Sequence, residues 1–220
     1  MPVHIKICGI TNPEDALAAV EAGADALGLV FAPSPRCVTL EQAKAIRMAV
    51  PSDVELVGVF VNEDFMAVHD AVLTAHLGGV QFYRNPISQW TEAECVRWLD
   101  IVLARGVRVV RAFPARDVES LRAELRQLPQ SVDQILLDAF VSGVEGGTGK
   151  TFDWTLAAAA KEFGNPVIIA GGLTPDNVAD AIRLTQPWGV DVSSGVESSP
   201  GRKDADAMRR FVTNARAASL

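Results

Sequence analysis

The sequence has no long uninterrupted apolar run. No segment approaches the ~18 consecutive apolar residues that a membrane-spanning helix needs. The opening stretch, Met1-Pro2-Val3-His4-Ile5-Lys6, also lacks the apolar core of a signal peptide. We therefore expect a cytoplasmic protein with no membrane partner.

Cysteine is scarce as well. The chain has three cysteines, Cys8, Cys37 and Cys95, which are far apart and show no metal-ligand spacing. An odd, scattered set argues against a disulfide framework and against a zinc site. We expect no metal and no cofactor, and each cysteine has to be considered by itself.

A basic block is missing too. Lysine and arginine total 20 against 27 acidic residues, which gives a net charge of −7. No basic patch is present to neutralise a phosphate backbone, so nucleic acid is not an expected partner. A small anionic substrate would have to be bound by local groups, such as glycine-rich turns, helix N-termini and single arginines.

The chain does contain a regular alternation of short apolar runs and amphipathic stretches over its 220 residues. This alternation predicts repeated βα units. The expected strands are residues 3–7, 25–30, 55–61, 79–82, 107–112, 133–137, 166–170 and 189–192. Helices are expected to begin near Asn12-Pro13, Thr39-Leu40, Asp64, Thr91, Asp117, Asp153, Thr174-Pro175 and Asp204, where N-cap residue types or an early proline occur.

Strands with apolar residues on both faces are typical of a parallel sheet covered by helices. Eight units favour a closed (β/α)₈ TIM barrel over an open sheet. A Rossmann-type sheet would also require Gly-x-Gly-x-x-Gly after its first strand, where this chain reads Cys8-Gly9-Ile10-Thr11-Asn12. No linker interrupts the pattern, and the longest non-periodic segment, residues 139–151, reads as a loop. We therefore predict an α/β fold with one domain, residues 1–220.

Active sites of such barrels lie at the C-terminal ends of the strands. The first strand ends at Lys6-Ile7-Cys8, where alternation places Lys6 and Cys8 on the same side. A nearby ammonium favours a thiolate, and a modest fall in the pKa of Cys8 would be enough for it to serve as a base near neutral pH. The alternative is that Cys8 is a small residue that fills the barrel interior.

Two other loops carry polar side chains. Arg36 follows the second strand in a loop stiffened by two prolines, and its planar guanidinium can bind both oxygens of a carboxylate. The alternative is that Arg36 is an ordinary surface arginine. Asp138 ends the sixth strand and can donate or accept a proton. The loop after it, Gly146-Gly147-Thr148-Gly149-Lys150, lacks the spacing of a nucleotide P-loop, but its glycines allow backbone amides to approach an anion.

The loops after the seventh and eighth strands begin with small residues. They read Ala170-Gly171-Gly172-Leu173 and Asp191-Val192-Ser193-Ser194-Gly195. Barrels of this kind often bind a phosphate there through backbone amides. The alternative is that the glycines only serve tight turns with positive φ. That explains one glycine-containing loop easily, but it explains two such loops after neighbouring strands less well. A phosphorylated small molecule is therefore the expected ligand.

Taken together, Lys6-Ile7-Cys8-Gly9-Ile10-Thr11, the Ser34-Pro35-Arg36 loop, the 146–150 loop before Phe152-Asp153-Trp154, Gly171-Gly172-Leu173 and the 191–197 stretch resemble the phosphoribosylanthranilate isomerase family of tryptophan biosynthesis. The resemblance covers the whole chain. It implies an Amadori rearrangement of N-(5-phosphoribosyl)anthranilate to 1-(2-carboxyphenylamino)-1-deoxyribulose 5-phosphate, without metal or cofactor.

The resemblance also implies residue roles. Cys8 corresponds to the family's general base and Asp138 to its general acid, while Arg36 would bind the anthranilate carboxylate. The substrate-binding set that we expect is completed by Lys6, Gly147, Gly171, Gly172, Ser193, Ser194 and Gly195, with the amides of Gly172, Ser194 and Gly195 on the phosphate. The protein is expected to be a monomer or a homodimer.

The fourth strand departs from the family pattern. The family usually reads Val-Gln-Leu-His-Gly there, whereas this chain has Val80-Gln81-Phe82-Tyr83-Arg84. Substrate contacts at this edge are expected to differ. Two alternatives therefore stay open: another phosphosugar isomerase or epimerase with different acid and base groups, and a phosphosugar-binding barrel without turnover.

Overall fold

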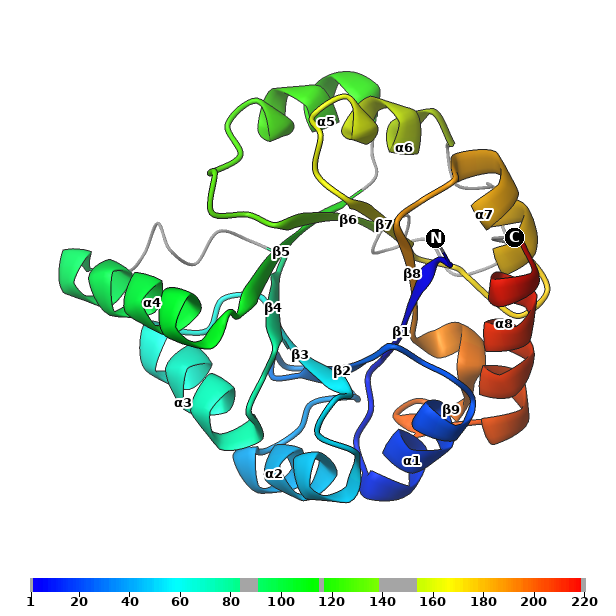
Figure 1. Ribbon diagram of the computed structural model, residues 1–220, viewed down its shortest axis with the longest axis horizontal. Helices are drawn as coiled ribbons and strands as arrows, with labels where there is room; N and C mark the ends of the chain where they lie inside the picture. The colour runs from blue at the N-terminus through cyan, green and yellow to red at the C-terminus, as the bar shows by residue number, and fades with distance from the viewer. Residues whose placement is uncertain (1, 84–90, 115–116, 139–153, 219–220) are drawn as a thin grey trace.

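The short apolar runs form parallel strands that close into a barrel, with the helices arranged around it (Figure 1). The computed structural model describes residues 2–83, 91–114, 117–138 and 154–218. The barrel strands are β1 (His4–Cys8), β2 (Ala26–Val30), β3 (Glu55–Phe60), β4 (Gly79–Phe82), β5 (Arg108–Pro114), β6 (Gln134–Asp138), β7 (Val167–Ala170) and β8 (Gly189–Val192). β4 and β8 have the predicted bounds, and the other strands differ by one or two residues. Because β1 pairs with both β2 and β8, the barrel sheet has no free edge.

The outer layer consists of the helices α1 (Pro13–Glu21), α2 (Leu40–Ala49), α3 (Phe65–Ala75), α4 (Glu92–Arg105), α5 (Val118–Leu125), α6 (Trp154–Lys161), α7 (Val178–Thr185) and α8 (Ala205–Ala218). Six start as predicted, with a side chain that accepts a backbone N–H of the first turn: Asn12, Thr39, Asp64, Thr91, Asp117 and Asp204. The predicted cap Asp153 lies outside the described residues. Of the helices described, none is both long and apolar enough to cross a bilayer.

The predicted start of α7 at Thr174-Pro175 is wrong, because the helix begins at Val178. The side chain of Asn177 explains the delay. Its Oδ1 accepts the N–H of Thr174 at 2.8 Å, and its Nδ2 donates to the carbonyl of Gly172 at 2.9 Å. These bonds hold residues 172–177 as a turn between β7 and α7, since the Asn177 side chain points back to the strand rather than into the helix.

Apolar residues pack on both faces of the sheet, as expected for a covered parallel sheet. One large cluster fills the space between strands and helices. A smaller one, which we call the interior cluster, lies inside the barrel and consists of Val110, Ala112, Leu136, Ile168 and Ala170. The barrel also buries polar side chains, namely Lys6 of β1, Gln81 of β4 and Asp191 of β8.

A small hairpin after β8 is absent from the sequence prediction. A 3₁₀ turn, η2 (Ser194–Val196), leads into β9 (Glu197–Ser199), which pairs antiparallel with β10 (Arg202–Lys203). Strands of three and two residues give no periodic signal. The hairpin is fixed to the loop after β1, because the hydroxyl of Thr11 donates to the carbonyl of Gly201 at 2.7 Å.

Candidate active site

A cavity of about 530 Å³ opens at the C-terminal ends of the barrel strands. Eight of the ten sequence-predicted site residues line it: Cys8, Arg36, Asp138, Gly171, Gly172, Ser193, Ser194 and Gly195. The other two are Lys6, which lies beneath the cavity rather than in its lining, and Gly147, which lies outside the described residues. The lining residues come from the ends of strands on different sides of the barrel.

Below the cavity, Lys6 forms a buried polar cluster with residues of β4 and β8. Its Nζ lies 2.9 Å from Asp191 Oδ2 and donates to Gln81 Oε1 at 2.9 Å. Lys6 is 3% exposed and Asp191 6%. Burial disfavours the ammonium, but the charges of Asp191 and Cys8 and the hydrogen bonds with them together outweigh it and raise the pKa of Lys6. Lys6 is thus a fixed positive charge.

Two polar atoms of this cluster have no hydrogen-bond partner in the described part of the chain: Asp191 Oδ1 and Gln81 Nε2. Buried polar atoms are nearly always paired, so an orphan needs an explanation. Asp191 also lines the cavity. Its second oxygen can therefore accept a hydrogen bond from a ligand hydroxyl. The sequence motif contained Asp191, but the expected site did not.

The sequence left the pKa of Cys8 open, and the structure does not lower it. Burial has the largest effect and raises the pKa of the thiol, and Lys6 opposes this only in part. The reason is that the charge of Lys6 is shared with Asp191, which itself disfavours a second anion nearby. Burial of Cys8 therefore favours its neutral thiol form.

At the opposite wall of the cavity, Tyr83 is hydrogen-bonded to Asp138. The Tyr83 hydroxyl donates to Asp138 Oδ2 at 2.8 Å. Burial and the neighbouring carboxylate raise the pKa of Tyr83 well above its ordinary value, so its hydroxyl stays protonated. The departure from the family pattern at this position therefore places an O–H donor on the predicted acid. Arg84, the second departure, lies outside the described residues.

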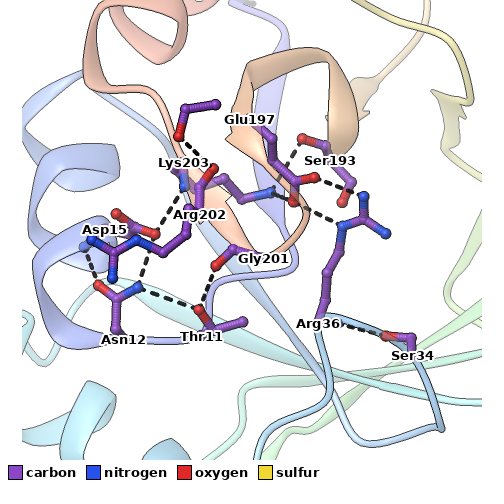
Figure 2. A network of polar contacts seen from close by, with 11 residues as sticks. Thr11, Asn12, Asp15, Ser34, Arg36, Ser193, Glu197, Gly201, Arg202 and Lys203 are labelled. Atoms are coloured by element: carbon purple, nitrogen blue, oxygen red, sulfur yellow. Dashed lines mark hydrogen bonds and ion pairs between the residues drawn. The ribbon is translucent and has the colours of Figure 1, made fainter.

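Arg36 reaches the cavity with one edge of its guanidinium already bound. Its Nε and Nη2 donate to Glu197 Oε1 and Oε2, each at 2.7 Å (Figure 2). This bidentate pairing raises the pKa of Arg36. The aliphatic part of the Arg36 side chain packs directly against Gly9. A Cβ at position 9 would lie 2.6 Å from Arg36 Cδ, so only glycine lets the Arg36 side chain come this close to the backbone.

Glu197 is held from a second side by Lys203. Lys203 Nζ lies 2.8 Å from Glu197 Oε1 and donates to the carbonyl of Ser193 at 3.1 Å (Figure 2). Burial alone would raise the pKa of Glu197, but the hydrogen bonds from Arg36 and Lys203 outweigh it and lower the pKa. Glu197 is therefore an anion that fixes Arg36. Sequence reasoning missed Lys203, since nothing in its local pattern signals burial.

The two small-residue turns approach each other closely above β7 and β8. A Cβ on Gly195 would lie 1.9 Å from the carbonyl oxygen of Leu173, which only glycine permits. Gly171 and Gly172 have φ values of 82° and 66°, in the left-handed region. Among the described residues, no hydrogen bond uses the N–H of Gly172, Ser194 or Gly195. Unused amides in paired turns suit an anion such as phosphate.

Comparisons of the sequence with known proteins all find isomerases of phosphoribosylanthranilate. The sequence model of the family "N-(5'phosphoribosyl)anthranilate (PRA) isomerase" matches residues 5–214. The N-(5'-phosphoribosyl)anthranilate isomerase of Geobacter sulfurreducens is 47% identical over 97% of this chain and 98% of its own.

Two solved structures are similar over nearly all of both chains. The phosphoribosyl anthranilate isomerase of Thermotoga maritima has a TM-score of 0.83 and 39% identity, covering 98% of this chain and 99% of that one. A phosphoribosyl anthranilate isomerase in complex with reduced 1-(o-carboxyphenylamino)-1-deoxyribulose 5-phosphate has a TM-score of 0.79 and 37% identity, with the same coverage.

Proposed function

The chain belongs to the N-(5'-phosphoribosyl)anthranilate isomerase family, and we propose that Cys8 is the general base and Asp138 the general acid of its reaction. The protein is an aldose–ketose isomerase of tryptophan biosynthesis. It converts N-(5-phosphoribosyl)anthranilate into 1-(2-carboxyphenylamino)-1-deoxyribulose 5-phosphate. The observation that carries the assignment of roles is that a thiol, a carboxyl group and two amide-lined turns line one cavity.

The reaction needs one proton given and one taken. Asp138 donates a proton to the furanose ring oxygen, the bond from C1 to that oxygen breaks, and the nitrogen lone pair forms a protonated Schiff base at C1. The cationic Schiff base makes the proton on C2 acidic, and Cys8 removes it. The resulting enolamine takes up a proton at C1 and loses the proton of its C2 hydroxyl, which gives the aminoketone.

Cys8 needs to lose its proton for this step, although burial raises its pKa in the ligand-free protein. The Schiff base supplies the missing positive charge. An opposite charge next to a buried group favours its ionised form. The iminium therefore favours loss of the Cys8 thiol proton to water, and the thiolate that results takes the proton from C2.

The substrate is held at both ends. The amides of Gly172, Ser194 and Gly195 bind the phosphate, with Gly171 and Ser193 shaping the turns. The guanidinium edge of Arg36 that Glu197 leaves open binds the anthranilate carboxylate. Asp191 Oδ1 accepts a hydrogen bond from a sugar hydroxyl, which removes its orphan state. Lys6 lies below the cavity and holds the carboxylate of Asp191 in place. Gly147, which lies outside the described residues, is also proposed to contact the substrate.

Turnover measurements on single variants test the acid and base. Freshly prepared phosphoribosylanthranilate is supplied and the loss of its fluorescence is followed. Cys8→Ala and Asp138→Asn are each expected to lower kcat ~10²–10⁴-fold, the usual contribution of a positioned proton-transfer group. Cys37→Ser, which changes an exposed thiol outside the cavity, serves as the control. A folded Cys8→Ala protein with a wild-type rate would refute the role of Cys8.

We also propose that residues 1–220 form one cytoplasmic domain that binds a phosphorylated small molecule and no nucleic acid, as a monomer or a homodimer. The family's place in amino-acid biosynthesis supports the cytoplasmic location. A Thermotoga maritima relative is described as dimeric. Light scattering measures the mass in solution, a single cooperative unfolding transition supports one domain, and cell fractionation reports the location.

A further inference from the structure

Tyr83 is the chain's only tyrosine, and the structure fixes it firmly at the cavity wall. It follows β4 directly, and its N–H donates to the carbonyl of Phe60 at 3.1 Å. The ring packs against the interior cluster. With backbone and ring both held, the hydroxyl has a defined position, and it donates to Asp138 Oδ2 at 2.8 Å.

We propose that Tyr83 is a positioning residue of the isomerisation, which acts by holding Oδ2 of Asp138 so that the acidic proton is carried by Oδ1. This inference rests on the proposed role of Asp138 as the general acid. An oxygen that already accepts an O–H bond is a poor site for a second proton, so the protonated carboxyl group carries its hydrogen on the other oxygen. The χ2 torsion of an aspartate otherwise takes a broad range of values, and a hydrogen bond to Oδ2 restricts that range.

The position of the proton matters because acid catalysis depends on geometry. A proton donor has to lie within hydrogen-bond reach of the ring oxygen as the C1–O bond breaks. A carboxyl group that rotates freely spends part of its time with the proton aimed elsewhere. An anchored carboxyl group presents the same oxygen in every turnover.

Tyr83 is suited to anchoring rather than to donating its own proton. Burial, Asp138, Cys8 and Asp191 all raise its pKa, so the hydroxyl is not ionised under conditions where the enzyme works. It therefore remains a neutral donor to Asp138. The charge of the site changes only at the groups that exchange protons with the substrate.

The test is a double-mutant cycle on kcat. Tyr83→Phe keeps the ring and removes only the hydroxyl. We expect kcat to fall ~10-fold with KM within about twofold of wild type, because orientation and not binding is lost. In an Asp138→Asn background, Tyr83→Phe should cause no further loss, since the hydroxyl then has no acid to position.

A matched control is Thr185→Val, which removes a buried hydroxyl that donates to the carbonyl of Ala181 at 2.6 Å, away from the cavity. It should lower stability without changing kcat. A wild-type kcat in Tyr83→Phe, or the same fold-loss with and without Asp138, overturns the inference while the role of Asp138 stands. A wild-type kcat in Asp138→Asn overturns the proposed acid itself, so the two failures are distinguishable.

Discussion

Arg36 and Glu197 meet edge to edge, with two hydrogen bonds of 2.7 Å between guanidinium and carboxylate. A guanidinium has five N–H donors. Glu197 uses one on Nε and one on Nη2, so both donors of Nη1 and the second of Nη2 remain for a ligand. A substrate carboxylate can therefore bind end-on while Glu197 keeps the plane of the group fixed.

Arg36→Lys should weaken substrate binding more than it slows turnover. Lysine can still pair with Glu197 as a point charge, but it cannot offer a second planar edge. We expect KM to rise ~10–100-fold with little change in kcat, as for the loss of charge-assisted hydrogen bonds. Inhibition by product analogues with and without the carboxylate measures the effect. Arg202→Lys, on the exposed part of the hairpin, is the control, and equal weakening of both analogues would argue against the assignment.

Alkylation of Cys8 should be slow at neutral pH and accelerate on the alkaline side. Burial raises the pKa of the thiol, so the reactive thiolate fraction is small at neutral pH and grows about tenfold per pH unit until the pKa is passed. The measurement is the rate of iodoacetamide labelling by intact mass, in a protein that also carries Cys37→Ser and Cys95→Ser. A rate that is already constant below neutral pH would show that the thiolate is the resting form.

Lys6→Met should destabilise the fold strongly, because it leaves Asp191 as an unpaired charge in the barrel interior. Removing one partner of a buried pair typically costs about 3–5 kcal/mol. Adding Asp191→Asn should recover much of this loss. Urea unfolding gives the free energies, and Arg183→Ala, which breaks an exposed pair with Asp180, should change stability by less than about 0.5 kcal/mol. Similar losses for Lys6→Met and Arg183→Ala would contradict the cost assigned to burial.

Gly195→Ala should weaken phosphate binding sharply. The added Cβ would lie 1.9 Å from the Leu173 carbonyl oxygen, so the two turns would have to separate. Gly172→Ala meets no atom within 4 Å and adds only backbone strain at a φ of 66°. Calorimetry with inorganic phosphate compares the two variants. Stronger loss in Gly172→Ala than in Gly195→Ala would mean that turn spacing does not determine binding.

The barrel could be predicted from sequence because its signals are local. Apolar runs that suit burial on both faces mark strands, and caps such as Thr39 and Asp64 bind backbone within three residues of themselves. The ends of the strands then indicate where site residues gather. The start of α7 was misplaced because Asn177 bonds backward to the loop instead of capping the helix.

The contacts that set the chemistry were not predictable, since they join residues far apart in the chain. Tyr83 and Asp138 are 55 positions apart, and Arg36 and Glu197 are 161 apart. Cys8 illustrates the same limit. Its neighbour Lys6 is visible in the sequence, but the burial of the thiol and the competing charge of Asp191 arise only when the barrel closes.

The pairing of β1 with β8 has a consequence for synthesis of the protein. His4 of β1 pairs with Gly189 of β8, so nearly the whole chain has to be synthesised before β1 can pair with its second neighbouring strand. In a nascent chain that still lacks β8, the sheet has two unpaired edge strands, and Lys6 has no Asp191 to pair with. Unpaired strand edges can pair with other chains. Premature termination before β8 should therefore yield insoluble fragments rather than weakly active enzyme.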